Sequence, residues 1–461
     1  MWPNLLSMEI RNRDVLVRGD KRRSHALAVI EAGIDAVLPE NVIRNTVKVE
    51  DERLTVGDRS FDLARYRHIY VAGGGKASGT MATELERLAN GRITAGTVID
   101  RYGTKAETKV IKVLHAGHPL PDENGVNGMR AIHDMLAAAG RDDLAIFLIS
   151  GGGSALMPCP APGVTLDDIV RLTDLLLKSG AAIAEINCVR KHTSGSSGGR
   201  ILGWTGGAEV LSLIVSDVVG DDPGSIASGP TAPDSTTYAD AMSILAKYRL
   251  TDRAPSRIVS HLKSGICGHA QESLKPGDPA FERVSNVVIA SNIVALEASA
   301  KKAQELGYRP IILGSRIKGE SREVGLVHAG IAGECLASGH PIAPPAAILS
   351  GGETTVTIVG NGKGGRNQEF VLGFLQGIRP GMTVASADTD GIDGATDACG
   401  AIADETTLKR AREMSLSVDD ALGSNNSFNF FSQLGDLIYT GPTGTNVSDL
   451  RCVLVYEPSQ R

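Results

Sequence analysis

Short apolar runs rich in β-branched residues alternate along the chain with longer stretches in which apolar residues recur at helical spacing. Runs of this length bounded by glycine or polar residues predict buried strands, and the longer stretches predict helices. The predicted strands are Arg67–Val71, Leu144–Ile149, Val210–Val215, Val287–Ala290, Pro310–Leu313, Ala346–Leu349, Thr355–Val359 and Met382–Ala387. The predicted helices are Ala77–Leu88, Leu166–Glu185, the stretch from the Ser291-Asn292 cap to Leu306, and Phe370–Leu375. Strands that alternate with helices predict an α/β fold with parallel sheets covered on both faces.

The stretch Ser264–Pro279 is polar, rich in Gly and Pro and without clear periodicity, which is typical of a linker between domains. A chain of 461 residues is also too long for one ordinary hydrophobic core. We therefore expect two domains, a large α/β domain over residues 1–280 and a smaller α/β domain over residues 281–461.

Composition narrows the class of protein. Apolar residues make up 42% of the chain and charged residues 22%, as in water-soluble globular proteins, and the net charge of −6 offers no basic footprint for nucleic acid. The six cysteines are scattered without a C-x-x-C pair, which argues against a zinc site or a disulfide framework. Met1–Asp20 lacks the apolar stretch of a signal peptide, and no run approaches the roughly 18 apolar residues of a membrane span. We expect a cytoplasmic protein without a nucleic-acid or membrane partner.

Three glycine-rich turns follow predicted strands, and glycine lets backbone N–H groups approach an anion closely at the start of a helix. The candidate phosphate-binding residues in these turns are Gly74, Gly75, Lys76, Ser150, Gly152, Gly153, Ser154 and Glu353. Each turn by itself is equally compatible with a tight strand-to-helix connection. Neither common nucleotide motif is present: a Walker A loop would need glycine in place of Tyr70, and the dinucleotide motif G-x-G-x-x-G misses Gly79 by one position.

The segment Gly360–Glu369 carries four glycines around Lys363 and Arg366, just before an apolar helix. A guanidinium in this position predicts binding of phosphate or carboxylate, and stabilisation of charge on a transferring phosphoryl group, with Asn367 beside it. The alternative is a long connection with solvated charges.

A second basic group is formed by Arg190 and Lys191, next to His192. Such a group predicts either a site for an acidic substrate or a solvated basic surface, and spacing alone favours the solvated surface. A single histidine also more often has a structural partner than a role as general base.

Acidic residues at strand ends balance these cations. Asp388, Asp390 and Asp393 follow one predicted strand, and Asp217 follows another. Carboxylates in such positions suit Mg²⁺, which takes one or two protein carboxylates and completes its shell with phosphate oxygens and water. Ile392 occupies a position that a calcium loop would give to Asp or Asn, so calcium is not expected. The alternative role of these residues is helix capping and turn formation.

Taken together, the motifs resemble those of the class II glycerate kinase family, in the family's order from about Ser24 to the C-terminus. The matching segments are Ala72–Ala77, Gly117–Asp122, Leu148–Leu156, Val189–His192, Ser216–Thr231, Gly351–Glu369, Asp388–Asp397 and Thr440–Val447. The resemblance implies ATP-dependent, Mg²⁺-assisted phosphorylation of D-glycerate to 2-phosphoglycerate. It also implies a large Rossmann-like three-layer domain and a smaller α/β domain, with the active site in the cleft between them.

The resemblance assigns the family's emphasised lysine and arginine to Lys76 and Arg366. Other family positions fall on Asp217, Glu353 and Asp388. From these we expect Mg²⁺ to bridge ATP to carboxylates of the Asp217 and Asp388 groups, Lys76 and Arg366 to neutralise developing charge, and Arg190 or Lys191 to hold the glycerate carboxylate.

The chain departs from the family in one loop, where Ser197 replaces the usual lysine. This removes a cation from an anion-facing loop and leaves the substrate open. Two alternatives also stay open: an NAD(P)H-dependent hydroxypyruvate reductase and a non-catalytic anion-binding module. The missing dinucleotide motif counts against the first, and the combination of cationic loops with acidic clusters counts against the second. Whether the protein is a homodimer is likewise open.

Overall fold

The structure, a computed structural model, describes residues 8–457 of the chain, which divides into two compact units. Unit 1 consists of the described residues up to Asn41 together with those from Ala290 onward, and unit 2 runs from Val42 to Ile289. The sequence predicted one boundary after residue 280 and placed residues 1–41 in the first domain, so the structure divides the chain differently. Of the segment Met1–Asp20, for which no signal peptide is predicted, residues 1–7 lie outside the described residues.

Helix packing explains why the N-terminal residues join the C-terminal unit. Helix α2 (Lys21–Ala36) packs against α11 (Asn292–Glu305), and the Ser299 hydroxyl donates a 2.9 Å hydrogen bond to the Val29 carbonyl. The apolar face of α2, including Leu27 and Ile30, is thereby fully buried. This contact joins segments more than 250 residues apart, which no local pattern could predict.

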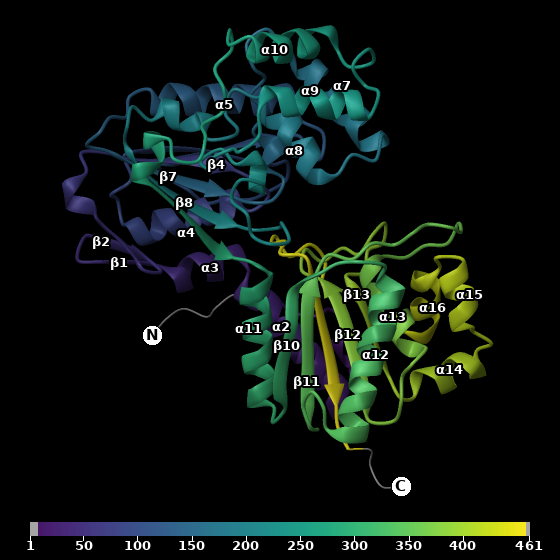
Figure 1. The fold of residues 1–461 in the computed structure, drawn as a ribbon. Helices are drawn as coiled ribbons and strands as arrows, with labels where there is room; N and C mark the ends of the chain where they lie inside the picture. The colour runs from purple at the N-terminus through teal and green to yellow at the C-terminus, as the bar shows by residue number, and fades with distance from the viewer. Residues whose placement is uncertain (1–7, 458–461) are drawn as a thin grey trace. The chain divides into compact units, whose positions relative to one another are not determined.

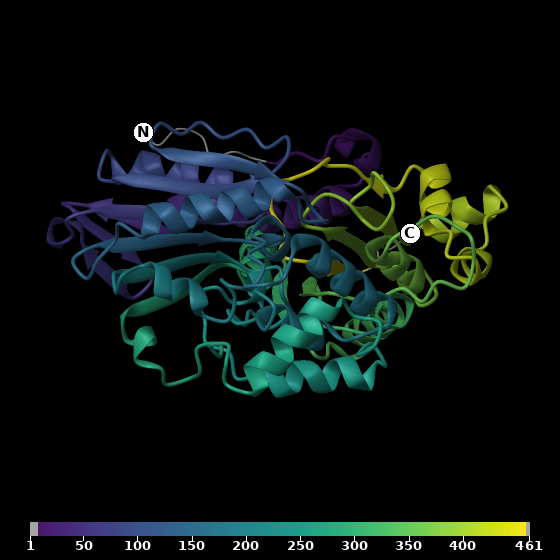
Figure 2. The same ribbon diagram turned by 90° about the horizontal axis from the view of Figure 1, so that it is seen from above.

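Unit 2 is built on a six-stranded sheet in the order β6-β5-β4-β7-β8-β9. Figure 1 labels β4, β7 and β8 of this sheet, and Figure 2 shows the same ribbon from above. Its strands are β4 (Ile69–Gly74), β5 (Ala95–Arg101), β6 (Ile111–Ala116), β7 (Leu144–Ile149), β8 (Glu209–Val215) and β9 (Val284–Ala290). Every pairing from β6 to β8 is parallel, as the sequence predicted. After β4 the chain adds β5 and β6 on one side and then crosses to add β7 and β8 on the other. The order therefore reverses beside β4, which is where open α/β sheets bind ligands.

Helices of unit 2 cover this sheet and form a further helical group. They are α3 (Pro39–Thr46, at the boundary with unit 1), α4 (Ser78–Ala89), α5 (Glu123–Leu136), α6 (Gly153–Leu156), α7 (Leu166–Lys178), α8 (Ile183–Lys191), α9 (Tyr238–Lys247) and α10 (Ser256–Ile266). Short 3-10 helices span Leu63–Arg65, Arg200–Trp204, Ile226–Ser228 and Pro279–Arg283, and a small antiparallel sheet consists of β1 (Val47–Glu50), β2 (Arg53–Val56) and β3 (Arg59–Asp62). Figure 1 shows α7, α9 and α10 gathered together, and their apolar faces share a core with α8.

Unit 1 contains a mixed six-stranded sheet in the order β10-β11-β15-β12-β13-β14. Its strands are β10 (Arg309–Ile317), β11 (Ala346–Gly352), β12 (Met382–Asp388), β13 (Gly400–Asp404), β14 (Leu437–Ile438) and β15 (Asp449–Val455). Only β10 and β11 pair in parallel, whereas β15 runs antiparallel to both β11 and β12. The prediction of purely parallel sheets is therefore wrong for this unit, because the last strand of the chain inserts between two earlier ones.

The helices of unit 1 lie on this sheet. They are α1 (Arg13–Val17), α2, α11, α12 (Ser321–Ser338), α13 (Arg366–Leu375), α14 (Thr407–Glu413), α15 (Val418–Gly423) and α16 (Ser427–Leu434). Helices α12 and α13 bury their apolar residues against Ile348, Val384 and Val453 of the sheet. Across residues 8–457, no helix combines the length and the apolar character that crossing a membrane requires.

Most predicted elements are confirmed, and β7 has the predicted bounds, Leu144–Ile149. Two predictions are wrong. The helix predicted over Leu166–Glu185 is two helices, α7 and α8, because the chain turns at Gly180 with φ +73°. The strand predicted over Thr355–Val359 does not form, and Ile358 is 78% exposed.

Side chains occupy the backbone groups that a strand at residues 355–359 would have paired. The Thr357 N–H donates 2.9 Å to Glu320 Oε1, and the Val359 N–H donates 2.7 Å to Asn425 Oδ1. An apolar β-branched run thus lies at the surface as an extended loop, held by side-chain acceptors in place of a neighbouring strand.

Candidate active site

Lys76 lies at the carboxyl edge of the unit 2 sheet, in the loop between β4 and α4. The ends of β4 and β7 are in register, with Gly74 opposite Ile149. The Lys76 N–H donates 2.9 Å to the Gly151 carbonyl, and the Ala77 N–H donates 3.1 Å to Ser150 Oγ. Two of the three glycine-rich turns therefore form one surface, at the position where the strand order reverses.

Glycine is required where these two turns meet. Gly152 has φ +81°, and a Cβ added there would lie 2.8 Å from His118 Cδ2 and 3.1 Å from Lys76 Cγ. Lys76 and His118 are thus both in contact with the second turn, and any larger residue at position 152 would displace them. Within the described part of the chain, no carboxylate forms an ion pair with Lys76. Burial, with Lys76 and Arg101 as nearby cations, lowers the pKa of His118, so its imidazole is neutral at pH 7.

Asp217 joins the same group from the end of β8. A Cβ added at Gly151 would lie 2.1 Å from Asp217 Oδ2, so the carboxylate packs directly on the backbone of the turn. We call Lys76, His118, Asp217 and the turn Ser150–Gly153 the Lys76 cluster. The structure brings together these residues from four loops of one sheet. His118 was not singled out as a site residue, although it lies in the Gly117–Asp122 segment that carries part of the family resemblance.

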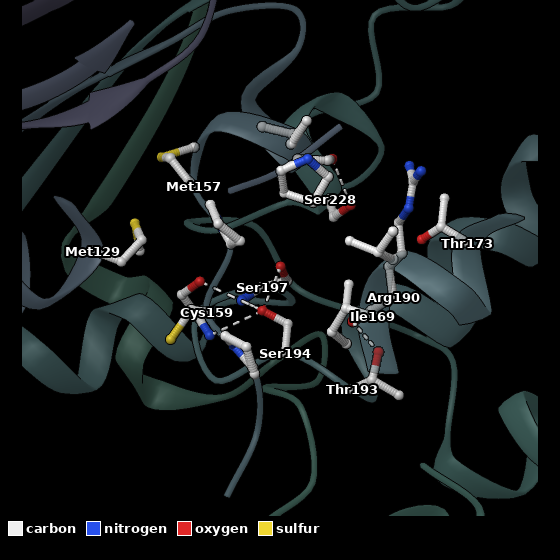
Figure 3. A pocket seen from close by; sticks show the side chains of 18 of the residues that line it. Met129, Met157, Cys159, Ile169, Thr173, Arg190, Thr193, Ser194, Ser197 and Ser228 are labelled. Carbon is white, nitrogen blue, oxygen red and sulfur yellow. Dashed lines mark hydrogen bonds between the residues drawn. The ribbon is translucent and has the colours of Figure 1, made fainter. Parts of the chain in front are cut away.

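A cavity of about 310 Å³ lies beside this cluster in unit 2. Ser154 and Ala155 of α6, one face of α7, Arg190 of α8 and the loop Thr193–Ser197 contribute to its wall. Figure 3 shows Arg190 and Thr173 on one side, Met129 and Met157 on the other, and Ser194 and Ser197 between them. We call this space the Arg190 cavity.

The surroundings of Arg190 and Lys191, which the sequence left as alternative ligands of the substrate carboxylate, differ in the structure. Lys191 is 9% exposed, and its ammonium lies 3.4 Å from the buried carboxylate of Asp234, so it has a structural partner. Arg190 lines the cavity, and among residues 8–457 no carboxylate or other hydrogen-bonding group pairs with its guanidinium. Burial lowers the pKa of Arg190, because the surroundings provide no compensating negative charge. An anion from outside would stabilise this guanidinium.

The loop in which Ser197 replaces the family's lysine is held by its own hydroxyls. Ser194 Oγ accepts from the N–H groups of Ser196 and Ser197, at 3.2 Å each, and from the Ser197 hydroxyl at 3.0 Å. His192 is fully buried behind the loop, with Nδ1 donating 2.8 Å to the Cys188 carbonyl and Nε2 2.9 Å from Glu272 Oε1. These contacts fit the structural role that the sequence favoured for His192.

The third glycine-rich turn, in unit 1, has a packing role. A Cβ at Gly351 would lie 1.8 Å from Asn292 Oδ1, and the Ser350 hydroxyl lies 2.8 Å from Nε2 of the buried His328. Burial lowers the pKa of His328 to about 4, and its Nδ1 donates 2.7 Å to the Val324 carbonyl, so its Nε2 accepts from the Ser350 hydroxyl. The backbone of this turn is therefore committed to the core, and only Glu353 at its end is exposed.

Strand register gathers four charged residues at one edge of the unit 1 sheet. Asp449, the first residue of β15, lies opposite Gly352 of β11 and opposite Asp388 of β12. Arg366, in the first turn of α13, donates 2.7 Å from Nε to Asp449 and 2.6 Å from Nη2 to Asp388, and its Nη1 lies 3.3 Å from Glu353. We call Arg366, Asp388, Asp449 and Glu353 the Arg366 cluster. The sequence predicted Arg366 as a site residue but gave no signal for Asp449.

Carboxylates outnumber cations in the Arg366 cluster. Burial opposes the charge on Arg366, but the Asp449 and Asp388 carboxylates raise its pKa above the usual value. Burial, with Asp449 and Asp390 nearby, raises the pKa of Asp388 well above its usual value. Arg451, which is fully buried, donates 2.6 Å to the second oxygen of Asp449. Arg366 also lines a cavity of about 380 Å³ in unit 1, together with Lys363.

Asp388 and Asp390, two of the predicted magnesium ligands, accept hydrogen bonds within the protein. Asp388 Oδ2 accepts from Arg366 and Oδ1 from the Asp390 N–H, and Asp390 Oδ1 accepts from the Ile392 N–H. Over residues 8–457, no group of three or more histidine, cysteine or carboxylate side chains is arranged to hold a metal ion. These contacts give Asp388 and Asp390 partners within the protein, and Asp217, Asp388 and Asp390 as Mg²⁺ ligands stay a prediction.

Asn367, predicted to bind substrate, is fully buried. Its Nδ2 donates 2.8 Å to Asp449, and its Oδ1 accepts a 2.5 Å hydrogen bond from Ser386. Both ends of the amide are thus used within the protein, and Asn367 fixes the position of Asp449.

The chain is similar to known proteins over most of its length. Residues 25–263 match the model of a domain of unknown function, DUF4147, and residues 346–449 match that of the MOFRL family. The chain is 41% identical over 435 residues to glycerate 2-kinase of Pyrococcus horikoshii, covering 94% of this chain and 97% of the relative. It is 41% identical over 389 residues to an Agrobacterium vitis protein with the provisional name hydroxypyruvate reductase, covering 84% and 86%. The crystal structure of glycerate kinase from Thermotoga maritima superposes with a TM-score of 0.83 at 36% identity, covering 94% of this chain and 99% of that one.

Proposed function

Because this chain belongs to the glycerate kinase family with a MOFRL domain, we propose that it is a glycerate 2-kinase, which transfers a phosphoryl group from ATP to D-glycerate. The match to relatives over nearly their full length confirms the family predicted from the sequence motifs. The observation that carries the assignment to a site is the Lys76 cluster: a lysine with no ion-pair partner among residues 8–457 lies on glycine-rich turns where the strand order of the sheet reverses.

In this proposal the Lys76 cluster binds the phosphates that are transferred. The turn Ser150–Gly153 contacts the stem of the Lys76 side chain at Gly152, and neutral His118 adds a polar group without a second positive charge. An ammonium that no described carboxylate neutralises can stabilise the negative charge that develops in the transition state. Because phosphoryl transfer depends mainly on position and electrostatics, such a site needs no covalent intermediate.

We assign the glycerate carboxylate to Arg190 and not to Lys191. Arg190 lines a cavity with no counter-ion among the described residues, whereas Lys191 already neutralises Asp234. A planar guanidinium can bind a carboxylate through two parallel hydrogen bonds. We assign the orientation of the attacking hydroxyl to Asp217, because its carboxylate packs on the same glycine-rich turn that Lys76 contacts.

Mg²⁺ enters the proposal as part of the MgATP substrate. Asp388 and Asp390 are already hydrogen-bonded within the protein, so the proposed mechanism does not depend on a metal ion bound by them. Arg366 is proposed to act by holding Asp388, Asp449 and Glu353 in place, and it also faces the unit 1 cavity together with Lys363.

A hydroxypyruvate reductase would need a site for NAD(P)H. The turn after β4, where a dinucleotide fold carries its glycine motif, lacks that motif in this chain. The reductase name of the Agrobacterium relative does not change this, because the chain is equally similar to a named kinase. A purely anion-binding module does not account for Asp217 on the same turn as Lys76.

The test is to identify the product directly. Purified protein is incubated with D-glycerate, ATP and Mg²⁺, and the products are resolved by phosphorus NMR against authentic 2-phosphoglycerate and 3-phosphoglycerate. We expect 2-phosphoglycerate. A parallel sample with hydroxypyruvate and NADH should show no loss of NADH, and NADH loss without any phosphorylated product would refute the kinase assignment.

A cytoplasmic location and a homodimer complete the proposal. The six cysteines are all free thiols, which fits a reducing compartment. Sedimentation of the purified protein would establish its oligomeric state.

A further inference from the structure

The Arg190 cavity is larger and more apolar than a three-carbon acid requires. A volume of about 310 Å³ lies at the lower end of the range, roughly 300–1,000 Å³, of pockets that bury drug-sized ligands. Its apolar wall is formed by Met129, Met157, Cys159, Ile169, Val170 and Ile201. D-Glycerate would occupy only the polar end of this space, and its second hydroxyl offers nothing to the apolar end.

The polar groups of the wall are mostly satisfied without a ligand. Ser154 Oγ and Ser228 Oγ lie 2.9 Å apart, and the Ser197 hydroxyl donates to Ser194. Asp174, the carboxylate in the wall, lies 2.8 Å from the ammonium of Lys178. The guanidinium of Arg190 is the charged group of the wall that has no partner within the described residues.

The charge and the shape of the cavity select the kind of ligand. One cation without a partner among the described residues matches the charge of a monoanion. A nucleoside triphosphate carries several negative charges, which the single cation Arg190 could not balance beside the carboxylate of Asp174. Figure 3 shows Arg190 on one side of the cavity and the thioethers of Met129 and Met157 on the other. A ligand that satisfies both sides has a carboxylate at one end and an apolar body at the other. Methionine side chains adapt readily to such a body.

We propose that the Arg190 cavity binds 2-hydroxy monocarboxylic acids with an apolar substituent, the carboxylate on Arg190 and the substituent against Met129 and Met157. This extends the acceptor site of the proposed kinase from glycerate to larger, less polar hydroxy acids, and it rests on that function only for the placement of the carboxylate. Such acids compete with D-glycerate for the site.

The test is a binding series measured by isothermal titration calorimetry. The probes are D-lactate, D-2-hydroxybutanoate, D-2-hydroxypentanoate and D-2-hydroxy-4-methylpentanoate, which share the carboxylate and hydroxyl and differ in the apolar substituent. Each buried methylene strengthens binding up to about fourfold, so we expect the last acid to bind at least about tenfold more tightly than lactate. Equal dissociation constants along the series would overturn the proposal.

Variants test the role of the guanidinium. Arg190→Gln should weaken binding of D-2-hydroxy-4-methylpentanoate at least about tenfold, and Arg190→Lys should restore part of it. Arg171→Gln, at an exposed position on α7 outside the cavity wall, is the matched control and should leave the affinity unchanged. Thermal melting of each variant confirms that it folds. Full affinity in a folded Arg190→Gln protein would refute the assignment, as would binding of the uncharged amide of the acid with the affinity of the acid itself.

Two further measurements separate this proposal from the proposed function. If MgATP displaces the bound acid competitively, the cavity is a nucleotide site and the proposal is wrong. If the protein phosphorylates D-glycerate but the longer acids neither bind nor inhibit, the kinase assignment stands and this proposal fails. If the acids bind through Arg190 and no phosphorylated glycerate is formed, the cavity is assigned correctly and the kinase assignment fails.

Discussion

We expect Asp393 to make the stability of unit 1 depend on pH. The substitution Asp393→Asn removes the titrating group, so comparison with wild type measures its effect. Asp393 is fully buried at the start of α13, where its two oxygens accept from the N–H groups of Asn367 and Gln368 at 3.0 and 2.9 Å. Burial raises its pKa from 3.8 to about 6. Between these values the unfolded chain has released a proton that the folded protein retains, so a rise in pH favours unfolding. The stability that protonated Asp393 contributes to the folded protein is therefore fully present below pH 3.8 and is lost as the pH rises through about 6.

The size of this effect follows from the shift. One pKa unit corresponds to about 1.4 kcal/mol, so the shift amounts to roughly 2 to 3 kcal/mol between pH 4 and pH 7. In a unit of roughly 150–250 residues this corresponds to a change of about 5 to 10 °C in Tm. The asparagine variant cannot ionise, and it loses one acceptor for the helix N–H groups at every pH, which costs about 1 kcal/mol.

Differential scanning calorimetry of both proteins from pH 4 to pH 7 measures the difference in Tm for the transition of unit 1. We expect wild type to be the more stable protein at pH 4 and to lose its advantage towards pH 7. Asp397→Asn, which changes an exposed aspartate in the same loop, is the control and should follow wild type at every pH. Parallel Tm curves for wild type and Asp393→Asn would refute the reasoning.

Two further substitutions test the residues of unit 2. Lys76→Met removes the cation of the Lys76 cluster, so kcat for glycerate phosphorylation should fall about 100-fold or more. The control Lys105→Met changes an exposed lysine and should keep wild-type kcat; near-normal turnover in Lys76→Met would remove this residue from the mechanism. Lys191→Met leaves the buried carboxylate of Asp234 without its lysine partner, so urea denaturation should show that the free energy of unfolding falls by about 3 kcal/mol. The control Lys178→Met breaks an exposed ion pair and should change the free energy of unfolding by less than about 1 kcal/mol. Equal effects of the two substitutions would contradict the structural role of Lys191.

The sequence predicts those parts of the fold whose cause is local. The apolar run Leu144–Ile149 and the glycines after it specify a buried strand and a tight turn, and the structure has both. The same local evidence could not predict β15, because a strand that inserts between β11 and β12 is selected by partners far away in the chain. Nor could it place α2 in unit 1, since its partner α11 follows more than 250 residues later.

The candidate site divides in the same way. Lys76 and Ser150 were recognisable, because each lies at the end of an apolar strand and beside glycines that a close backbone approach requires. The choice between Arg190 and Lys191 was not recognisable, since two adjacent residues of one basic run differ only in what faces them. Asp234, the residue that decides between them, lies more than 40 positions further along the chain.

Arg366 shows what a sequence pattern leaves out of an electrostatic argument. In the sequence it stands among glycines and another cation, and such surroundings favour an anion as its ligand. In the structure the register of β11, β15 and β12 brings three carboxyl groups to this one guanidinium. Binding of a phosphate at this guanidinium would have to displace those carboxylates, whereas no carboxylate of the described residues forms an ion pair with Lys76 or Arg190. We therefore expect the anions of a phosphoryl transfer reaction at Lys76 and Arg190 of unit 2, and we propose that Arg366 keeps its acidic neighbours in place.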